Sequence, residues 1–275
     1  PPAQNGRGRK PQKNAVAQLA DKYNIPLVEI EDFSTEDAAV MLSGLQLDLG
    51  IVVAFKILPP EIFFIPVHGM INLHPSRLPD LRGAAPLNWA IAKGYKKSAF
   101  TIFFLDDKVD SGNIILQREF EIDPDENVLE LQIRLVNPAA NSLMEAVDLI
   151  DNNEIIPQKQ KGEVTKAPKI TEKHLKIDWS QDASTIHNYI RAFAPKPGAF
   201  SFFDNKRIKI IRSAISDIAI ESKEQGIVER FTRDGVLVHT GNGMIELLTL
   251  QPQNKKIISG RDFFIGYAKG SKKFE

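Results

Sequence analysis

The feature that most constrains the fold is a continuous apolar run from Leu49 to Phe55, with the sequence LGIVVAF. Such a run, without alternating polar residues, is typical of a strand buried on both faces of a parallel sheet. Further strand-like apolar segments follow at 70–71, 100–105 and 114–122, with helical periodicity between or after them at 86–93 and 127–151. Strands that alternate with helices predict a doubly wound, mostly parallel α/β sheet of the Rossmann-like kind.

Several flanking elements are predicted with the same rules. Residues 14–23 and 35–45 show helical patterns, and residues 26–30 show the pattern of a short strand. In the long segment 127–151, apolar residues recur at helical spacing, and we expect the following to face inward: Leu129, Ile133, Leu143, Val147 and Ile150.

The second half of the chain has a different character. Residues 161–173 are charged and lack periodicity, and a helix is predicted at 182–193. From Gly198 onward, short apolar runs are separated by turn pairs such as Asp234-Gly235 and Asn242-Gly243, which favour hairpins. Five or six short strands predict a small OB-like β-barrel. We therefore expect a first domain over 1–160, a linker over 161–170 and a second domain over 171–275.

Three polar residues gather at one predicted strand end. Successive side chains alternate between the faces of a strand, so Asn72, His74 and Ser76 point to the same side. A loop rich in proline and glycine follows, and open α/β sheets bind ligands at the carboxyl ends of their strands. The sequence therefore indicates a site here, although a histidine that is only hydrogen-bonded at the strand end remains an alternative.

The same stretch resembles a known family. The segments NLHPS (72–76), LP (78–79) and RGAAP (82–86) are similar to those of formyltransferases that use 10-formyltetrahydrofolate, and within them to the methionyl-tRNA formyltransferases. The resemblance continues through the second half, in IDW (177–179), PGA (197–199), LQP (250–252) and GRDF (260–263). It therefore covers nearly the whole chain.

The resemblance implies an activity and a set of site residues. The formyl group would pass from 10-formyltetrahydrofolate to the amino group of methionyl-initiator tRNA, with Asn72 and His74 stabilising the oxyanion and Asp110, in the family's D-S/T-G pattern, relaying the proton. The resemblance also implies contacts with the folate from the following residues: Phe55, Leu58, Ser76, Leu78, Pro79, Asp106, Asp107, Lys108 and Val109. At Lys56 the chain departs from the family, which often has glycine there.

The acidic loop 106–110 leaves other interpretations open when it is considered by itself. A solvated turn would explain its charge, and adjacent carboxylates can bind a metal ion, although no histidine or cysteine accompanies them. We expect no metal. The chain has no cysteine at all, which excludes disulfides and a thiolate nucleophile.

The distribution of charge suggests a nucleic-acid partner, although the net charge is zero. Both ends of the chain are basic. We expect the following residues to contact tRNA: Arg7, Arg9, Lys10, Lys255, Lys256 and Arg261. Solvated tails without a partner are the alternative for charge runs of this kind.

The remaining expectations concern the setting of the protein. No apolar run reaches the roughly 18 residues of a membrane span, and we expect a cytoplasmic protein that is a monomer at full length. Members of the family open with a strand–helix–strand unit of about 30 residues before the loop at 6–10. We expect that this unit is missing here and that the chain alone is poorly stable.

Two other activities would use the same first domain. An amino-sugar formyltransferase is one, but the basic residues of the second domain favour a tRNA substrate. A formyltetrahydrofolate hydrolase is the other, with water as the nucleophile. A non-catalytic RNA-binding barrel attached to a decayed sheet domain is a further alternative, against which the intact Asn72, His74 and Asp110 argue.

Overall fold

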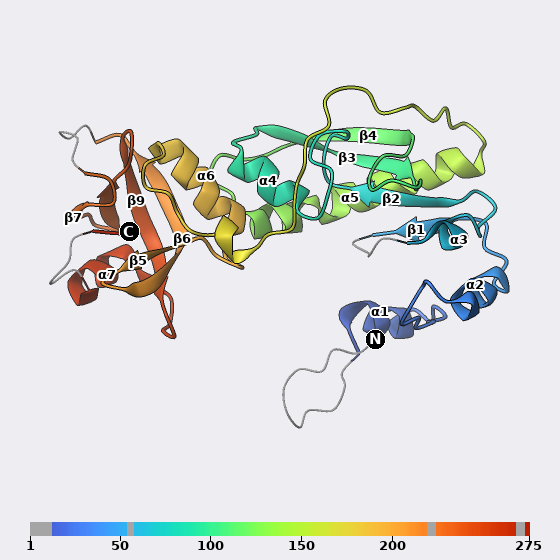
Figure 1. Cartoon of the computed structure of the whole chain (residues 1–275), viewed down its shortest axis with the longest axis horizontal. Coiled ribbons are helices and arrows are strands. Elements are labelled where there is room, and N and C mark those ends of the chain that lie inside the picture. The colour runs from blue at the N-terminus through green and yellow to red at the C-terminus, as the bar shows by residue number, and fades with distance from the viewer. Residues whose placement is uncertain (1–12, 54–57, 219–223, 268–272) are drawn as a thin grey trace. The chain divides into compact units, whose positions relative to one another are not determined.

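The computed structural model describes residues 13–53, 58–218, 224–267 and 273–275 (Figure 1). The chain divides into two compact units, and each is described by itself. Unit 1 comprises residues 1–71 and 105–107, and unit 2 comprises residues 72–104 and 108–275.

The described part of unit 1 contains three short helices and a short strand. These are α1 (Ala15–Lys22), α2 (Glu36–Ser43), β1 (Gly50–Val52) and α3 (Pro60–Phe63). The side chains of Asn14 and Thr35 cap α1 and α2 by accepting backbone N–H groups, as their sequence positions predict. Residues 26–30 form no strand, because no described segment pairs with them, so that prediction was wrong.

Unit 2 begins within strand β2 (Met70–His74), which is followed by α4 (Pro86–Ala92), β3 (Lys97–Phe104), β4 (Ile114–Glu121) and α5 (Val128–Asp151). Strands β2, β3 and β4 are hydrogen-bonded neighbours in this order. Strand β4 runs antiparallel to β3, so the sheet is mixed. A parallel pair needs a crossover of a dozen or more residues, whereas the short loop at 105–113 contains no helix.

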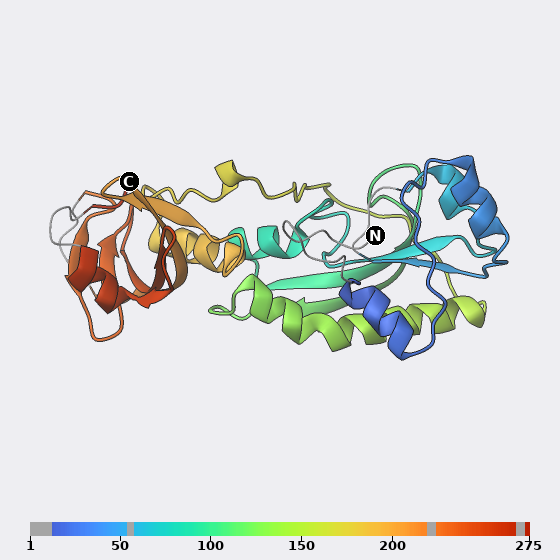
Figure 2. The same cartoon turned by 90° about the horizontal axis from the view of Figure 1, so that it is seen from below.

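Helix α5 runs along one face of β3 and β4 (Figure 2). Asn127 and Glu130 form a capping box at its start. Its buried apolar residues are Val128, Leu131, Leu135, Ala146 and Ile150, whereas Leu129 and Ile133 are exposed. The predicted inward face was therefore correct at Ile150 and wrong at Leu129 and Ile133, because apolar residues occur on both faces of this helix and periodicity alone does not choose between them.

The rest of unit 2 is an antiparallel β domain entered through helix α6 (Ala183–Phe193). Its strands are β5 (Phe200–Phe203), β6 (Lys206–Ser216), β7 (Val228–Phe231), β8 (Val236–His239), β9 (Met244–Pro252) and β10 (Ile258–Ser259). The order is β5-β6-β9-β8-β7, with β10 beside β9. Bridges from Phe274 to Phe203 and from Lys273 to Ile227 connect the C-terminal residues with both edges of this sheet.

A last helix, α7 (Gly260–Tyr267), was not predicted; it packs Phe263 into the core of the β domain. The two-part fold class is confirmed, as a Rossmann-like mixed sheet followed by an antiparallel domain. None of the helices among the described residues is long and apolar enough to cross a membrane.

Candidate active site

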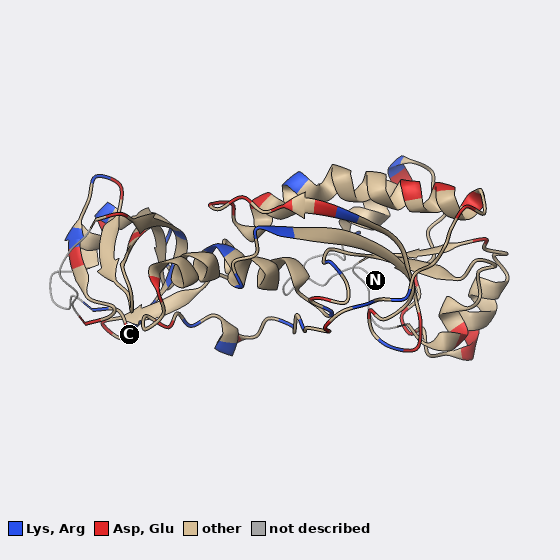
Figure 3. Ribbon diagram, turned by 90° about the horizontal axis from the view of Figure 1, so that it is seen from above, with Lys and Arg blue, Asp and Glu red and all other residues tan. Residues whose placement is uncertain are grey.

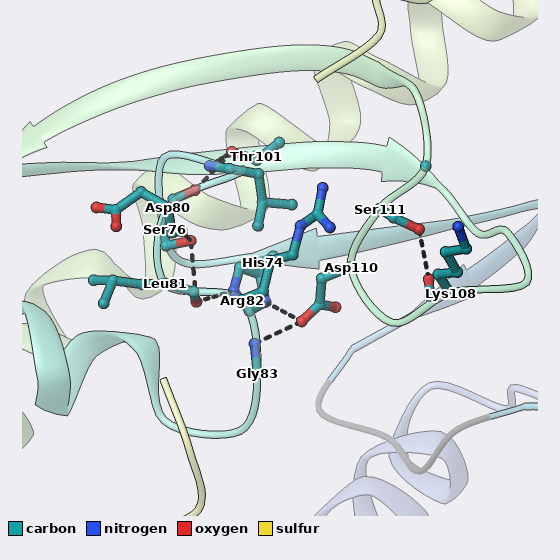
Figure 4. Close-up of polar contacts among 12 residues, drawn as sticks. His74, Ser76, Asp80, Leu81, Arg82, Gly83, Thr101, Lys108, Asp110 and Ser111 are labelled. Carbon is teal, nitrogen blue, oxygen red and sulfur yellow. Dashed lines mark hydrogen bonds and ion pairs between the residues drawn. The ribbon is translucent and has the colours of Figure 1, made fainter. Parts of the chain in front are cut away.

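His74 ends strand β2 and is buried, with 5% of its surface exposed. Its Nε2 lies 3.0 Å from the carbonyl oxygen of Leu81 (Figure 4). A carbonyl only accepts hydrogen bonds, so Nε2 carries the proton and donates it. The other ring nitrogen, Nδ1, lies 3.8 Å from Oδ2 of Asp110. The imidazole is therefore fixed on one side and faces a carboxylate on the other.

Asp110 lies in the loop between β3 and β4, and its side chain is 11% exposed. Its Oδ2 accepts a hydrogen bond from the backbone N–H of Gly83 at 2.8 Å. Its backbone has φ +54°, in the left-handed region that costs a non-glycine residue about 1 kcal/mol. Gly112 allows the loop to close, because a Cβ there would lie 1.7 Å from the carbonyl oxygen of Phe104. The positive φ at Asp110 and the close approach at Gly112 thus constrain which residue types the Asp-Ser-Gly sequence can contain.

The loop after β2 is held by buried polar groups. The Ser76 hydroxyl, which is fully buried, donates to the carbonyl of Asp80 at 2.6 Å. Thr101 donates to the carbonyl of Ser76 at 2.6 Å and accepts the N–H of Leu78 at 3.2 Å. Leu78 and Pro79 are buried as well. The side chains of Ser76, Leu78 and Pro79 therefore shape the loop, and their predicted contact with folate stays a prediction.

Asn72 lies two residues before His74 on β2 and so projects from the same face of the strand. It is half-buried. Among the residues that the structure describes, none hydrogen-bonds its side-chain amide. Its N–H₂ group is thus available to a ligand at this strand end.

The remaining predicted folate contacts are distributed over both units. Phe55, like Lys56, lies outside the described residues. Leu58 belongs to unit 1 and packs against the core formed by Ala38, Ile62, Phe63 and Met70, while Asp106 and Asp107 are exposed in the same unit. Lys108 and Val109, in unit 2, are exposed. No group of three or more potential metal ligands occurs within the described ranges.

The predicted tRNA contacts are only partly described. Arg7, Arg9 and Lys10 lie outside the described residues. Lys255 and Lys256 are exposed in the turn after β9, and Arg261 is exposed in the first turn of α7. Whether the two basic regions face the same side stays a prediction.

A segment that spans the end of the predicted first domain and most of the predicted linker lies against the site. Residues 158–168, called the strap below, run along the loop after β2. The side chain of Gln160 contacts three groups: its Nε2 donates to the carbonyls of Asp110 at 2.9 Å and Gly112 at 3.0 Å, and its Oε1 accepts from Arg82 Nη2 at 2.6 Å. A lone glutamine in an aperiodic segment gives no sequence signal, so Gln160 was missed.

Further bonds fasten the strap along its length. The Thr165 hydroxyl accepts the N–H of Leu81 at 2.9 Å and donates to the Asp80 carboxylate. Arg82 exchanges two backbone hydrogen bonds with the strap, at 3.0 Å and 2.7 Å. A Cβ on Gly83 would lie 2.7 Å from the Ala167 carbonyl oxygen, so the close approach of the two segments requires glycine there.

The geometry brings three groups of different chemistry to one end of β2. These are an amide with no partner among the described residues, a buried imidazole and a largely buried carboxylate. Amide and imidazole donors suit a developing oxyanion, and the carboxylate is within reach to move a proton. The fold and the site together are those expected of an acyl-transfer enzyme.

Comparison with known proteins identifies the class and then the family. The profile described as "Formyl transferase" matches residues 1–147, and that described as "Formyl transferase, C-terminal domain" matches residues 169–268. The methionyl-tRNA formyltransferase of Alkaliphilus oremlandii is 37% identical over 98% of this chain and 87% of the relative; that of Thermodesulfovibrio yellowstonii is 34% identical over 97% and 85%. The chain belongs to the formyl transferases, within the family of the methionyl-tRNA formyltransferases.

Solved structures share the fold. WlaRD, a sugar 3N-formyl transferase crystallised in the presence of dTDP and 5-N-formyl-THF, superimposes with a TM-score of 0.66 at 22% identity and covers 88% of this chain and 82% of its own. The methionyl-tRNA formyltransferase of Clostridium thermocellum superimposes with a TM-score of 0.56 at 22% identity, over 73% of this chain and 88% of its own.

Proposed function

We propose that the protein transfers the formyl group of 10-formyltetrahydrofolate to the amino group of methionine on initiator tRNA, as a cytoplasmic monomer. The relatives that match along nearly the whole chain are named for this reaction. The observation that supports the assignment of the site is the close approach of the buried His74 to Asp110, whose carboxylate accepts the Gly83 N–H near the end of β2.

The first step is attack of the methionine amine on the formyl carbon. A new C–N bond forms, and negative charge develops on the formyl oxygen. The amide of Asn72 donates a hydrogen bond to this oxygen, and His74 does so when it is protonated, since hydrogen-bond donors aimed at a developing charge lower the barrier. The C–N10 bond then breaks and the carbonyl is restored.

Proton transfer accompanies both steps. The attacking amine must lose a proton and the leaving N10 must gain one. Nε2 of His74 is already committed to the Leu81 carbonyl, so a proton taken up by the pair resides on Nδ1 or on the Asp110 carboxylate. Asp110 receives the proton from the amine, directly or through water, and returns it to N10.

The decisive test replaces Asp110 with asparagine. This change keeps the shape of the side chain and removes the base, so turnover should fall by a factor of about 100 to 10,000 while folate binding persists. Formylation would be assayed with methionyl-tRNA, a dTDP-linked amino sugar and water as acceptors. Near-normal turnover of Asp110→Asn would refute the role of Asp110, and formylation of the sugar alone would refute the tRNA substrate.

Binding of tRNA has a second, independent signature. Lysines lie along the strap and the segment after it (Figure 3), where they are exposed, and add to the exposed Lys255 and Lys256 on the β domain. Each phosphate contact should contribute a log–log salt slope of about −0.7 to −0.9. Changing Lys255 and Lys256 together to glutamine should flatten this slope, and tRNA binding that does not respond to salt would contradict the assignment.

A further inference from the structure

The side chain of Gln160 uses its whole amide group to connect the strap with the loop that carries Asp110. Its two N–H bonds point to the carbonyl oxygens of Asp110 and Gly112, and its oxygen accepts from Arg82. Gln160 itself is half-buried, and the three contacts span 48 to 78 residues of sequence. An amide with all its groups paired at such a place fixes the segments it joins.

These contacts bear on both members of the His74–Asp110 pair. Asp110 has an unfavourable backbone conformation at φ +54°, which persists only when its surroundings hold it. Gly83 holds the carboxylate of Asp110, and Gln160 holds its backbone carbonyl. Arg82, the third partner of Gln160, directly follows Leu81, whose carbonyl fixes the His74 ring.

We propose that Gln160 is a positioning residue for formyl transfer, which keeps the Asp110 carboxylate at its place beside His74. This proposal rests on the function proposed above. Gln160 touches neither substrate nor reacting atoms in this proposal; it acts through Asp110. Misplacement of a reacting group by about 1 Å can cost a factor of about 100 in rate, so the loss of one such amide should appear in turnover.

Three variants separate this role from a general contribution to stability. Gln160→Ala removes all three contacts. Gln160→Glu keeps the size of the side chain and its bond to Arg82, but places an oxygen against the two carbonyls. Gln158→Ala is the matched control, because Gln158 belongs to the same strap and pairs with Ile114 through its backbone, while the residue is exposed.

The experiment measures kcat, KM for folate and for tRNA, the pH profile of kcat and the amide hydrogen exchange of Gly83, whose N–H is bonded to the Asp110 carboxylate. We expect Gln160→Ala and Gln160→Glu to lower kcat by about 10- to 100-fold, with KM changed less than about threefold. The Gly83 amide should exchange faster in both variants, and the pH profile should shift. Gln158→Ala should behave as the unmodified protein.

Two results would overturn the proposal. If kcat and Gly83 exchange of Gln160→Ala match those of Gln158→Ala while Asp110→Asn is inactive, Gln160 has no positioning role although the proposed function stands. If Gln160→Glu is fully active, the two N–H bonds are irrelevant. By contrast, an active Asp110→Asn would refute the proposed role of Asp110 and with it the positioning role of Gln160, whereas formylation of the sugar alone would refute the proposed tRNA substrate.

Discussion

Two of the buried histidines in unit 2, His74 and His187, share most of their environment and differ at one nitrogen. Both expose 5% of their surface or less. Each directs Nε2 at a backbone carbonyl, that of Leu81 at 3.0 Å and that of Pro124 at 3.2 Å, so both carry the proton on the same nitrogen. Each also has an aspartate within 4 Å, Asp110 for His74 and Asp125 for His187.

The difference lies at Nδ1. In His187 this nitrogen pairs with the Ser213 hydroxyl at 3.0 Å, so every polar atom of the ring is satisfied within the protein. In His74 it faces the largely buried Asp110 carboxylate at 3.8 Å, beyond hydrogen-bond distance. For this pair, burial and a nearby carboxylate therefore do not distinguish the histidine that packs the fold from the one proposed to be catalytic, whereas the state of the second nitrogen does.

Replacing each histidine with glutamine should give the largest difference in turnover between the two positions. The glutamine amide can still donate to the backbone carbonyl, but it lacks Nδ1. We expect His74→Gln to lower turnover by about 100-fold or more, because the donor and proton site is lost, and His187→Gln to stay within about threefold of the original. Steady-state formylation with circular dichroism as a folding control measures both. Equal activities of the two variants would show that His74 and His187 do not differ in function.

Part of this comparison was accessible from the sequence. Asn72 and His74 follow an apolar run and precede a loop rich in proline and glycine, and Asp110 follows the next apolar strand, so the rules for α/β sheets place them at one edge. His187 gave no such signal, because it lies within an amphipathic helix pattern. Its partners Pro124 and Ser213 are distant in sequence.

The rest of the site could not be predicted for a similar reason. Gln160 acts through hydrogen bonds to backbone carbonyls, which leave no residue-type signature at the other end. Nothing in the sequence therefore predicted contacts between the strap and the site; Gln160 belongs to the predicted first domain and residues 161–168 to the predicted linker. Helix α5 illustrates the same limit in packing, since Leu129 and Ile133 have the expected spacing and yet are exposed. Periodicity reports that a face exists, but long-range contacts decide which face is buried.

His187 should contribute to the stability of the protein, although it contributes little to turnover. His187→Ala leaves the Ser213 hydroxyl and the Pro124 carbonyl without their partner and opens a space between α6 and β6. We expect the free energy of unfolding to fall by about 1–3 kcal/mol. Urea denaturation followed by fluorescence measures it, and Gln158→Ala is the control. A loss below about 0.5 kcal/mol would show that His187 is not structural.

The pH dependence of stability should carry the signature of His187 as well. Burial lowers the pKa of His187 below its usual 6.5. The unfolded chain then binds a proton more readily than the folded one, so stability is full above about pH 6.5 and falls as the pH drops toward the lowered pKa. Unfolding in urea between pH 8 and pH 5 should show this loss of stability. The His187→Gln protein should lose less stability over the same range, because the part caused by His187 is absent. An identical pH dependence of the two proteins would contradict the assignment.

The smallest effect should come from the aspartate beside His187. Asp125 Oδ1 lies 3.4 Å from Nε2, but the Asp125 side chain is 83% exposed, so water and salt screen the pair. Its charge still raises the pKa of His187 against the dominant effect of burial. Removing it in Asp125→Asn should lower that pKa further and make the protein slightly more sensitive to acid.

At pH 8, where His187 is neutral, Asp125→Asn should leave the free energy of unfolding within about 0.5 kcal/mol of the original, because an exposed pair with an uncharged partner contributes little. Near pH 5.5 it should be less stable by up to about 1 kcal/mol, and 1 M salt should remove the difference. Turnover should be unchanged, in contrast to the large loss expected for Asp110→Asn. A turnover defect in Asp125→Asn would mean that the two histidine–aspartate pairs are not functionally distinct, and that the second nitrogen of the ring is the wrong criterion.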